Sequence, residues 1–467
     1  MSVSTGLANA LVSGLVTGSI VALGAIGLAL VYSIASVPNF AHGELLTLGA
    51  YVAFLVNTPG TAPVFGGIGP SGSEVALLIR AVLFVASAAA VVSVVYLWGG
   101  HDAVRGEWFR DRRVGTVLNA AVAIGVGAVV AAGAPSVWSG LVFGALAVAV
   151  IAPVVDSVVF RKFREEGAGL ATMLMVALGV SFVLRFGTQA VYGGGTRRFE
   201  VPETVGAVGY ETSLQAAKHF DAYVGTNGFV VAVTDTATEA TVGIVEFTWL
   251  AVAGVVVSAS VAAYLAWIAS ARSDRLPSSA AGAVALGVAT AVITAVALAS
   301  SAVRPDEFAG ATRIRMSVLR ALIVVVALCM MVSLHLLLHR TKLGTAMRAA
   351  SDNLDLAKVT GIDTDRVMRA TWMIAGAFAG TGGVLLGMRV SSVTVSLGFD
   401  VLVPMFAAVV LGGVGSVYGA VIGSYLVGLS MDAGVYLVPG VGPEYRVPMA
   451  FAVLLVVLLV KPEGLRG

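Results

Sequence analysis

Apolar stretches of about 20 residues recur along the whole chain, and few folds accommodate them. A hydrocarbon core about 30 Å thick needs roughly 20 apolar residues for each crossing helix. Of the 467 residues, 58% are hydrophobic and only 12% are charged, too few to cover a soluble globule of this size. Runs such as 450–460 are apolar on every face, whereas the strands of a membrane β-barrel alternate. The sequence therefore predicts an all-α, polytopic bundle of transmembrane helices.

We expect about 12 to 13 segments in one membrane-spanning domain that covers 1–467. The apolar segments lie at about 10–33, 43–56, 75–98, 114–133, 138–158, 168–190, 246–271, 279–302, 316–338, 367–388, 401–415, 416–437 and 446–461. Two of them, 43–56 and 401–415, are too short to cross unaided and are expected to be half-helices, re-entrant segments or parts of broken helices. No Lys or Arg precedes Arg80, so we expect the first segment to be a retained helix and not a cleaved signal.

Basic residues favour cytoplasmic loops and so predict an orientation. If loop 339–366 is inside and all thirteen segments cross, 17 of the 28 Lys and Arg fall inside, while outside loops 57–74 and 134–138 have none. This orientation places the N-terminus outside and the C-terminus in the cytoplasm. One connection argues against it, because 303–320 is expected outside yet contains four arginines: Arg304, Arg313, Arg315 and Arg320.

The longest non-apolar stretch, 191–245, is expected outside as either a small ordered lid or a loose loop. It has no room for a nucleotide-binding domain, and no G-x-x-x-x-G-K-[ST] phosphate loop occurs in the sequence. ATP hydrolysis, if it drives this protein, is expected from another chain. We predict no enzymatic activity, cofactor or metal site, and the net charge of +2 gives no support for a nucleic-acid partner.

The most distinctive polar cluster, PNFAHGE at 38–44, separates the first apolar helix from a short second one. Ionisable groups at membrane depth are costly and are usually paired or in contact with a pathway. Asn39 is placed to cap a helix that begins at Phe40, and the positive end of a half-helix can seat a substrate carboxylate. Asn39, His42 and Glu44 are therefore candidates for a translocation path or hinge. The alternative is a structural cap, with His42 and Glu44 satisfied by neighbouring helices.

A second informative stretch, 340–369, places six basic residues and four aspartates between two long apolar segments. Its apolar spacing predicts a short amphipathic helix over 345–358, bounded by Gly344 and Gly361. Such a helix suits docking into a groove on a partner. The alternative is an ordinary charged loop held at the interface by snorkelling arginines.

Glycines recur at four-residue spacing, as in Gly376 and Gly380 or Gly383 and Gly387, which favours close packing of helices. The run LGGVGS at 411–416 predicts a break between two segments. This break either lines a cavity or forms a tight turn.

Four stretches together resemble the permease family of branched-chain amino acid ABC importers, in particular its LivH type. They are NFAHGELLTLGAY at 39–51, GTAMRAASDNLDLAKVTGIDTDRV at 344–367, AAVVLGGVGSVYGAVIG at 407–423 and KPEGL at 461–465. The resemblance implies that 339–366 is the cytoplasmic loop that couples to an ATPase. Its recurring small positions are Gly344, Ala349, Ala350 and Gly361, and Arg348 lies among them.

The resemblance also implies partners: two ATP-binding subunits, a second permease subunit and an extracellular solute-binding protein, all working at the plasma membrane. The family's usual chain is shorter, and the surplus here is interpreted as two inserted, peripheral helix hairpins within 99–150 and 272–315. The expected function is import of branched-chain amino acids by alternating access. A urea or short-amide permease would share these motifs, an ion-coupled secondary transporter would use intramembrane acids such as Asp156, and a structural scaffold would leave the coupling loop unexplained.

Overall fold

The computed structural model describes residues 3–35, 39–58, 73–104, 112–133, 137–199 and 312–461, with shorter pieces between 204 and 261. The chain divides into two compact units. The smaller unit comprises Met1–Val12 and Ala217–Val318, and the larger comprises Ser13–Ala216 and Leu319–Gly467.

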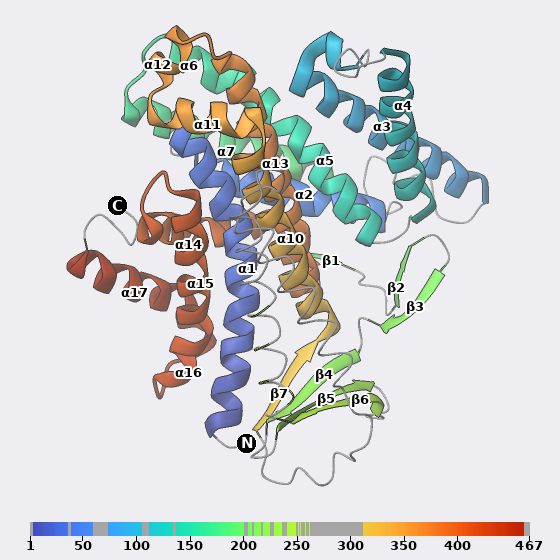
Figure 1. Ribbon diagram of the computed structural model, residues 1–467, viewed down its shortest axis with the longest axis vertical. Helices are drawn as coiled ribbons and strands as arrows, with labels where there is room; N and C mark the ends of the chain where they lie inside the picture. Colours follow the sequence, from blue (N-terminus) through green and yellow to red (C-terminus); the bar gives the residue numbers. More distant parts are fainter. Residues whose placement is uncertain are drawn as a thin grey trace. The chain divides into compact units, whose positions relative to one another are not determined.

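The larger unit is a bundle of helices, drawn with their labels in Figure 1. The helices are α1 (Val3–Ala35, which begins in the smaller unit), α2 (His42–Asn57), α3 (Ser73–Val104), α4 (Arg112–Gly133), α5 (Val137–Val155), α6 (Arg161–Glu165), α7 (Leu170–Tyr192), α10 (Val318–Arg340), α11 (Lys342–Asp352), α12 (Leu354–Val359), α13 (Thr364–Val390), α14 (Leu397–Gly412), α15 (Val417–Leu429), α16 (Val435–Leu437) and α17 (Arg446–Val460). Two π-helical turns, η3 (Asp156–Phe160) and η5 (Ser430–Gly434), continue α5 and α15.

The predicted membrane bundle is confirmed. Among the described residues, eight helical spans are long and apolar enough to cross a bilayer, and two shorter apolar helices accompany them at Gly115–Ala131 and Leu397–Gly412. Helix α2 fills the predicted segment 43–56. The predicted segment 279–302 lies outside the described residues, as does most of 246–271, whose first three residues end a strand.

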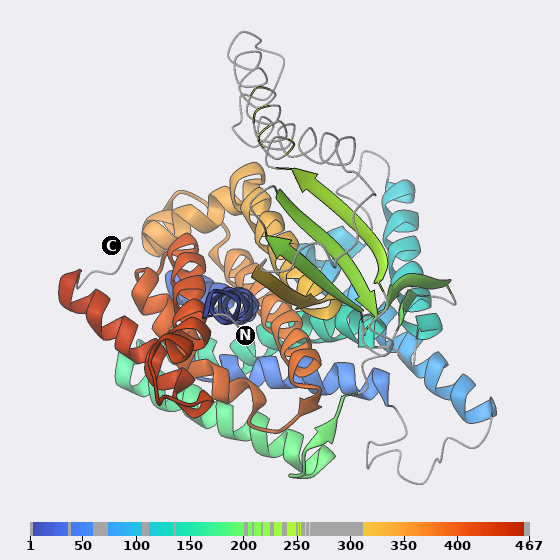
Figure 2. The same ribbon diagram turned by 90° about the horizontal axis from the view of Figure 1, so that it is seen from below.

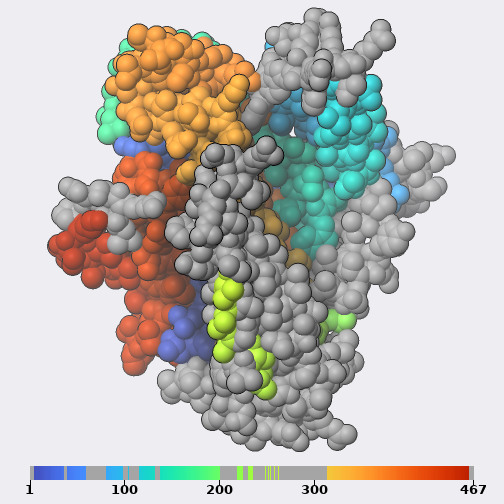
Figure 3. All heavy atoms as spheres, viewed as in Figure 1, coloured from blue at the N-terminus to red at the C-terminus, as the bar shows by residue number. Residues whose placement is uncertain are grey.

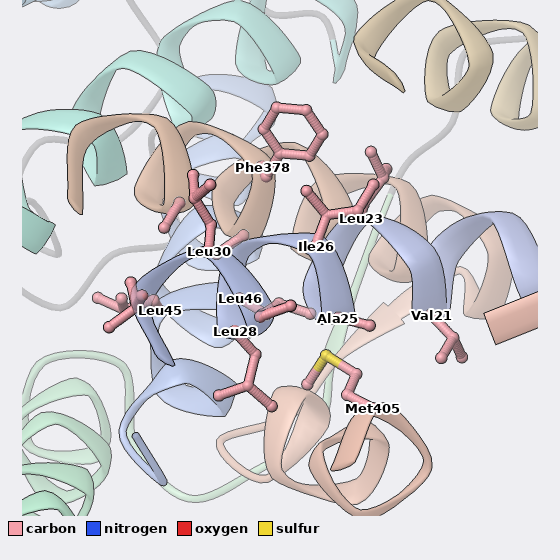
Figure 4. Packing of buried hydrophobic residues seen from close by; sticks show 14 of the residues in the cluster. Val21, Leu23, Ala25, Ile26, Leu28, Leu30, Leu45, Leu46, Phe378 and Met405 are labelled. Carbon is pink, nitrogen blue, oxygen red and sulfur yellow. The ribbon is translucent and has the colours of Figure 1, made fainter. Parts of the chain in front are cut away.

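Helix α1 is the central helix of the larger unit. In its most apolar 18-residue stretch, 94% is buried inside the protein. Figure 2 shows α1 nearly end-on among the other helices. Figure 4 shows its side chains against two other helices: Leu23 and Ile26 face Phe378 of α13, while Met405 of α14 reaches Ala25. The sulfur of Met405 occupies the space that a side chain at Gly24 would need.

The short helix α2 lies inside protein, which is the condition under which a segment too short to cross is tolerated. Thirteen of its 16 residues are buried, and it packs against α5, α13 and α14. A methyl group on Gly49 would come within 2.5 Å of the Cα of Gly380 on α13, so these two backbones touch. The predicted use of the glycines for close helix packing is therefore correct at this crossing.

The packing of α5 differs from the peripheral hairpin predicted within 99–150. Helix α5 contacts α2 and α13 in the core, where the backbone of Ala53 leaves no room for a side chain at Gly140. Helix α3 packs mainly on α4, and both have many exposed apolar residues. The peripheral pair is therefore α3 with α4. Of the second predicted hairpin, 272–315, all but the last four residues lie outside the described part of the chain.

The predicted break at 411–416 is a tight turn that also borders a cavity. Gly413 and Gly415 adopt the left-handed backbone that glycine tolerates, with φ of 98° and 88°. The hydroxyl of Ser416 then caps α15 by accepting from the backbone N–H of Gly419 at 3.0 Å. Gly415 and Ser416 line a cavity of about 220 Å³ beside α10 and α11.

The smaller unit contains a four-stranded antiparallel sheet in the order β6-β5-β4-β7. Its strands are β4 (Lys218–Val224), β5 (Gly228–Asp235), β6 (Thr241–Thr248) and β7 (Thr312–Ser317). The stretch 191–245 is thus ordered over these strands, which sequence periodicity did not distinguish from a loose loop. In the larger unit, β2 (Thr204–Ala207) pairs with β3 (Tyr210–Gln215), and β1 (Arg197–Arg198) pairs with β8 (Ser392–Val393).

The sheet accounts for two of the arginines that argued against the predicted orientation. Asp221 on β4 is opposite Arg315 on β7, and Arg313 lies two residues away on the same face. Both guanidinium groups bond the Asp221 carboxylate, Arg313 at 2.9 Å and Arg315 at 3.0 Å. These arginines therefore serve as ion-pair partners of Asp221 within the sheet, so they carry little information about membrane orientation.

Candidate translocation and coupling sites

The cluster Asn39, His42 and Glu44 is buried at the start of α2, with each residue at most 1% exposed. The prediction that Asn39 caps a helix beginning at Phe40 is wrong. The helix begins at His42 with Ala41 as its N-cap, because the first helical hydrogen bond is accepted by the Ala41 carbonyl. Asn39 precedes this cap by two residues and contributes its backbone carbonyl to a turn, accepting from the N–H of His42 at 3.2 Å.

Glu44 is bound by a neighbouring helix. Its Oε1 accepts from Arg185 of α7 through Nη2 at 2.6 Å and Nε at 3.0 Å, and from the hydroxyl of Ser181 at 3.2 Å. The guanidinium of Arg185 also lies over the ring of Phe399, 4.1 Å from its centroid. For one carboxylate oxygen of Glu44, these contacts match the alternative of a group satisfied by neighbouring helices. Arg185 was not singled out from the sequence, although a lone arginine within the apolar segment 168–190 was a signal.

The remaining polar groups of this cluster are the His42 imidazole, the Asn39 amide and the second carboxylate oxygen of Glu44, and none of them is held by Arg185. The imidazole of His42 lies against α1, where a methyl group on Gly27 would come within 2.7 Å of its Cε1. Among the described residues, no hydrogen bond reaches the side-chain amide of Asn39 or the second oxygen of Glu44. Buried polar atoms in this condition are costly, which distinguishes this point of the bundle from its apolar surroundings.

The stretch 342–359 forms two helices, where a single helix over 345–358 was predicted. Asn353 has an extended backbone, and its side chain caps α12 by accepting from the N–H of Leu356 at 2.9 Å. Thr341 caps α11 in the same way through the N–H of Gly344 at 3.0 Å. Asparagine is more favourable as an N-cap than inside a helix, because its side chain can accept from a backbone N–H at the start of the next helix. This preference of Asn353 explains why the stretch is divided into α11 and α12.

The small residues of this stretch face the bundle. Gly344 is buried, and a methyl group on it would meet the Cα of Leu338 at 2.5 Å, so α11 lies directly against the end of α10. Ala350 is also buried, Ala349 is half-buried, and Arg348 is exposed. Gly361 has a φ of 89°, which turns the chain toward α13.

The outer side of α11 and α12 is open, as the orange surface of this segment shows in Figure 3. Leu356 is 61% exposed and Val359 is 85% exposed, although the surrounding residues are charged or polar. Behind the two helices lies a cavity of about 660 Å³, lined by Ser33 to Ala35 at the end of α1 and by Ala350 to Leu354. Helix α12 therefore presents apolar side chains outward, and a cavity lies behind the pair.

Asp156, the intramembrane acid expected of an ion-coupled transporter, is held by a bidentate ion pair. Arg164 donates to its Oδ1 at 2.6 Å and to its Oδ2 at 3.1 Å. A carboxylate occupied in this way stabilises the joint between η3 and α6.

These features define a polytopic, helical membrane protein. The chain belongs to the family described as branched-chain amino acid transport system / permease component, whose model matches residues 10–101 and 220–458, more than half of the chain.

Curated relatives agree with this family. The chain is similar to the high-affinity branched-chain amino acid transport system permease protein LivH of Escherichia coli K12, 37% identical over 150 residues, which are 32% of this chain and 47% of that protein. It is 35% identical over 151 residues to BraD of Pseudomonas aeruginosa, a permease protein of the same description, covering 32% of this chain and 48% of BraD. A weaker similarity, 37% over 91 residues, connects it to the galactose/methyl galactoside import permease protein MglC of Haemophilus influenzae, with 18% of this chain and 27% of that protein covered. The chain spans about half the length of the first two relatives, and no solved structure matches it.

Proposed function

We propose that the chain is the membrane subunit of an ATP-driven importer that carries branched-chain amino acids. The observation that carries this proposal is the α11–α12 pair: two capped helices with exposed Leu356 and Val359, seated on the end of α10 in a chain of the permease family. Apolar side chains exposed on a charged loop are suited to a protein partner. The names of the relatives LivH and BraD support branched-chain amino acids as the cargo.

In this proposal two ATP-binding subunits dock on α11 and α12, and a second permease subunit completes the membrane part. An extracellular solute-binding protein delivers the amino acid. Closure of the ATPase dimer moves α11 and α12 against α10, and the bundle shifts between outward and inward access. His42 lies where α1, α2 and α13 meet and acts with Asn39 as the hinge or path, while Glu44 fixes α2 to α7.

The proposed orientation follows from the same pair. With α11 and α12 in the cytoplasm, the end of α1 at Ser33 to Ala35 is also cytoplasmic, because it lines the cavity behind them. The N-terminus is then outside, in agreement with the distribution of basic residues, and the C-terminus is in the cytoplasm. The sheet of the smaller unit is proposed to be extracellular and to meet the solute-binding protein.

Uptake in cells that carry the intact transport operon tests this proposal. Labelled leucine and labelled urea are compared in wild type and in Arg348→Glu, with Arg198→Glu as a control because Arg198 is an exposed arginine on β1. We expect ATP-dependent leucine uptake in wild type and in the control, and neither uptake nor co-purification of the ATPase in Arg348→Glu. Uptake of urea in place of leucine would move the cargo to amides, and uptake independent of the ATPase would overturn the proposal.

A further inference from the structure

A cavity of about 340 Å³ lies in the larger unit among α1, α10, α13, α14, η5 and α17. Five charged residues line it: Arg320, Arg389, Arg446, Asp400 and Asp432. Arg389 is 25 residues along α13 from Thr364, which places it about 38 Å along the helix from the α12 end. The cavity is therefore at the end of the bundle opposite α11 and α12, near α16 in Figure 1.

Asp432 is the buried centre of this charge cluster, with a side chain only 3% exposed. It forms ion pairs with Arg389 at 3.7 Å and Arg446 at 3.3 Å, and the hydroxyl of Thr17 also donates to it. Two guanidinium groups carry about ten N–H donors, whereas one carboxylate offers about four acceptor positions, one of them taken by Thr17. The cluster thus retains donors and positive charge for an additional carboxylate.

The backbone around Asp432 is π-helical over η5, a widening of the helix that is frequent at functional sites. This widening is an observation independent of the charges, and Asp432 lines the cavity.

A second pole of opposite polarity lies on α14. The carboxylate of Asp400 is exposed and accepts from the hydroxyl of Ser396 at 3.2 Å. Pro404 lies four residues further along and has no N–H to donate, so the Asp400 carbonyl loses its helical hydrogen bond. The Asp400 carboxylate can therefore accept from an ammonium group, and the same residue carries a carbonyl without its usual helical donor.

The rest of the cavity wall is largely apolar and includes Ile20, Val21, Leu386, Val401, Pro404 and Met431. Methionine adapts to ligands of different shape, and branched aliphatic residues favour an aliphatic side chain.

We infer that this cavity binds the amino acid itself as a zwitterion. Its carboxylate lies against Arg389 and Arg446, its ammonium lies at Asp400, and its aliphatic side chain contacts the wall of Val21, Val401 and Met431. The inference rests on the proposed function, which it deepens: the permease contributes its own selectivity for a free aliphatic amino acid, in addition to any selectivity of a binding protein.

Binding to the intact complex, purified into lipid nanodiscs without the solute-binding protein, tests this site. Labelled leucine is the probe, with unlabelled leucine, leucinamide and 4-methylpentanoate as competitors. Leucinamide lacks the carboxylate and 4-methylpentanoate lacks the ammonium. We expect each analogue to compete at least about tenfold more weakly than leucine, since each loses charge-assisted hydrogen bonds.

Two substitutions test the charged contacts and the apolar contacts of the cavity separately. Arg389→Gln is expected to weaken leucine binding at least about tenfold, while the matched control Arg198→Gln leaves it unchanged. Val401→Trp fills the apolar wall without changing any charge and is expected to abolish binding. Co-purification of the ATPase with Val401→Trp checks that this variant folds.

ATP-driven leucine uptake by the same complex with its binding protein reports on the proposed function separately. If wild type takes up leucine but Arg389→Gln and Val401→Trp bind it normally, the site is wrong and the function stands. Equal competition by leucine and both analogues also overturns the site. If wild type fails to take up leucine yet discriminates among the three competitors, the site stands and the proposed function fails.

Discussion

Arg185 of α7 binds a single carboxylate oxygen of Glu44 on α2 through two of its nitrogens, at 2.6 and 3.0 Å. The carboxylate side chain is 1% exposed and the guanidinium side chain is 17% exposed, so this ion pair is shielded from water. The pair fixes the start of the buried helix α2 to a helix far away in the sequence.

Removing one partner of this pair is expected to destabilise the protein strongly. Arg185→Met leaves the Glu44 carboxylate buried without its counter-charge, which costs about 3 to 5 kcal/mol. The double variant Arg185→Met with Glu44→Gln should recover most of this loss, because no charge is then left buried. Thermal unfolding of the two variants and wild type in one detergent measures the difference. A double variant no more stable than Arg185→Met would contradict this role of the pair.

Two glycine-to-alanine variants separate close packing from intrinsic helix propensity. Gly49→Ala is expected to cost about 1 to 3 kcal/mol, because the new methyl group meets the α13 backbone at 2.5 Å. Gly179→Ala on α7 meets nothing within 4 Å and should stabilise by up to about 1 kcal/mol, since alanine favours helix. Thermal unfolding of both variants measures the contrast, and equal effects would mean that the α2–α13 contact is looser than described.

The docking role of α12 can be tested by a substitution that leaves the fold unchanged. Val359 is 85% exposed, so Val359→Asp is expected to alter stability by no more than about 0.5 kcal/mol. It should nevertheless prevent co-purification of the ATPase, because a charge replaces an apolar contact. Val438→Asp, at an exposed valine after α16, is the matched control and should retain the ATPase. Retention of the ATPase by Val359→Asp would exclude this residue from the interface.

The sheet of the smaller unit is expected to weaken in acid. Asp221 is buried, which by itself raises its pKa, but hydrogen bonds from Arg313, Thr234 and Arg315 lower the pKa to about 2. An unfolded Asp has a pKa of about 3.9, so the stabilisation is complete above that pH and is lost as the pH falls toward 2. Hydrogen exchange of β4 peptides, corrected for the intrinsic pH dependence, should show this loss in wild type. Asp221→Asn should remain equally protected across the range; a parallel loss in that variant would assign the effect to another group.

The membrane bundle was predictable because its signal is repeated and local. Apolar runs mark the helices, and the runs 43–56 and 401–415 are too short to cross a bilayer unaided, so α2 and α14 were recognisable as short. The tight turn after α14 was marked by its own glycines. Apolar spacing also predicted a helix in the stretch 345–358, although it did not reveal that Asn353 would divide that helix.

The remaining features depend on contacts between distant parts of the chain. Arg185 is 141 residues from Glu44, and Thr17 is 415 residues from Asp432, so no window of sequence contains either pair. The sheet was missed because β4 pairs with the distant strand β7, where Arg313 is 92 residues from Asp221 in the chain. The central position of α5 was missed because its composition matches that of a peripheral helix, and only the backbone contact of Gly140 with Ala53 reveals it.

The enclosure of α2 has a consequence for synthesis. Its burial comes from α5, α13 and α14, and the counter-charge of Glu44 is on α7, all of which follow it in the chain. When α2 leaves the ribosome, it therefore has neither the length to span a bilayer nor a partner for its carboxylate. It must wait at the membrane surface or beside the insertion machinery until at least α7 is made. The Glu44–Arg185 ion pair therefore determines the earliest stage of synthesis at which α2 can be buried. In a chain truncated before Arg185, a cysteine introduced into α2 should remain accessible to a water-soluble thiol reagent.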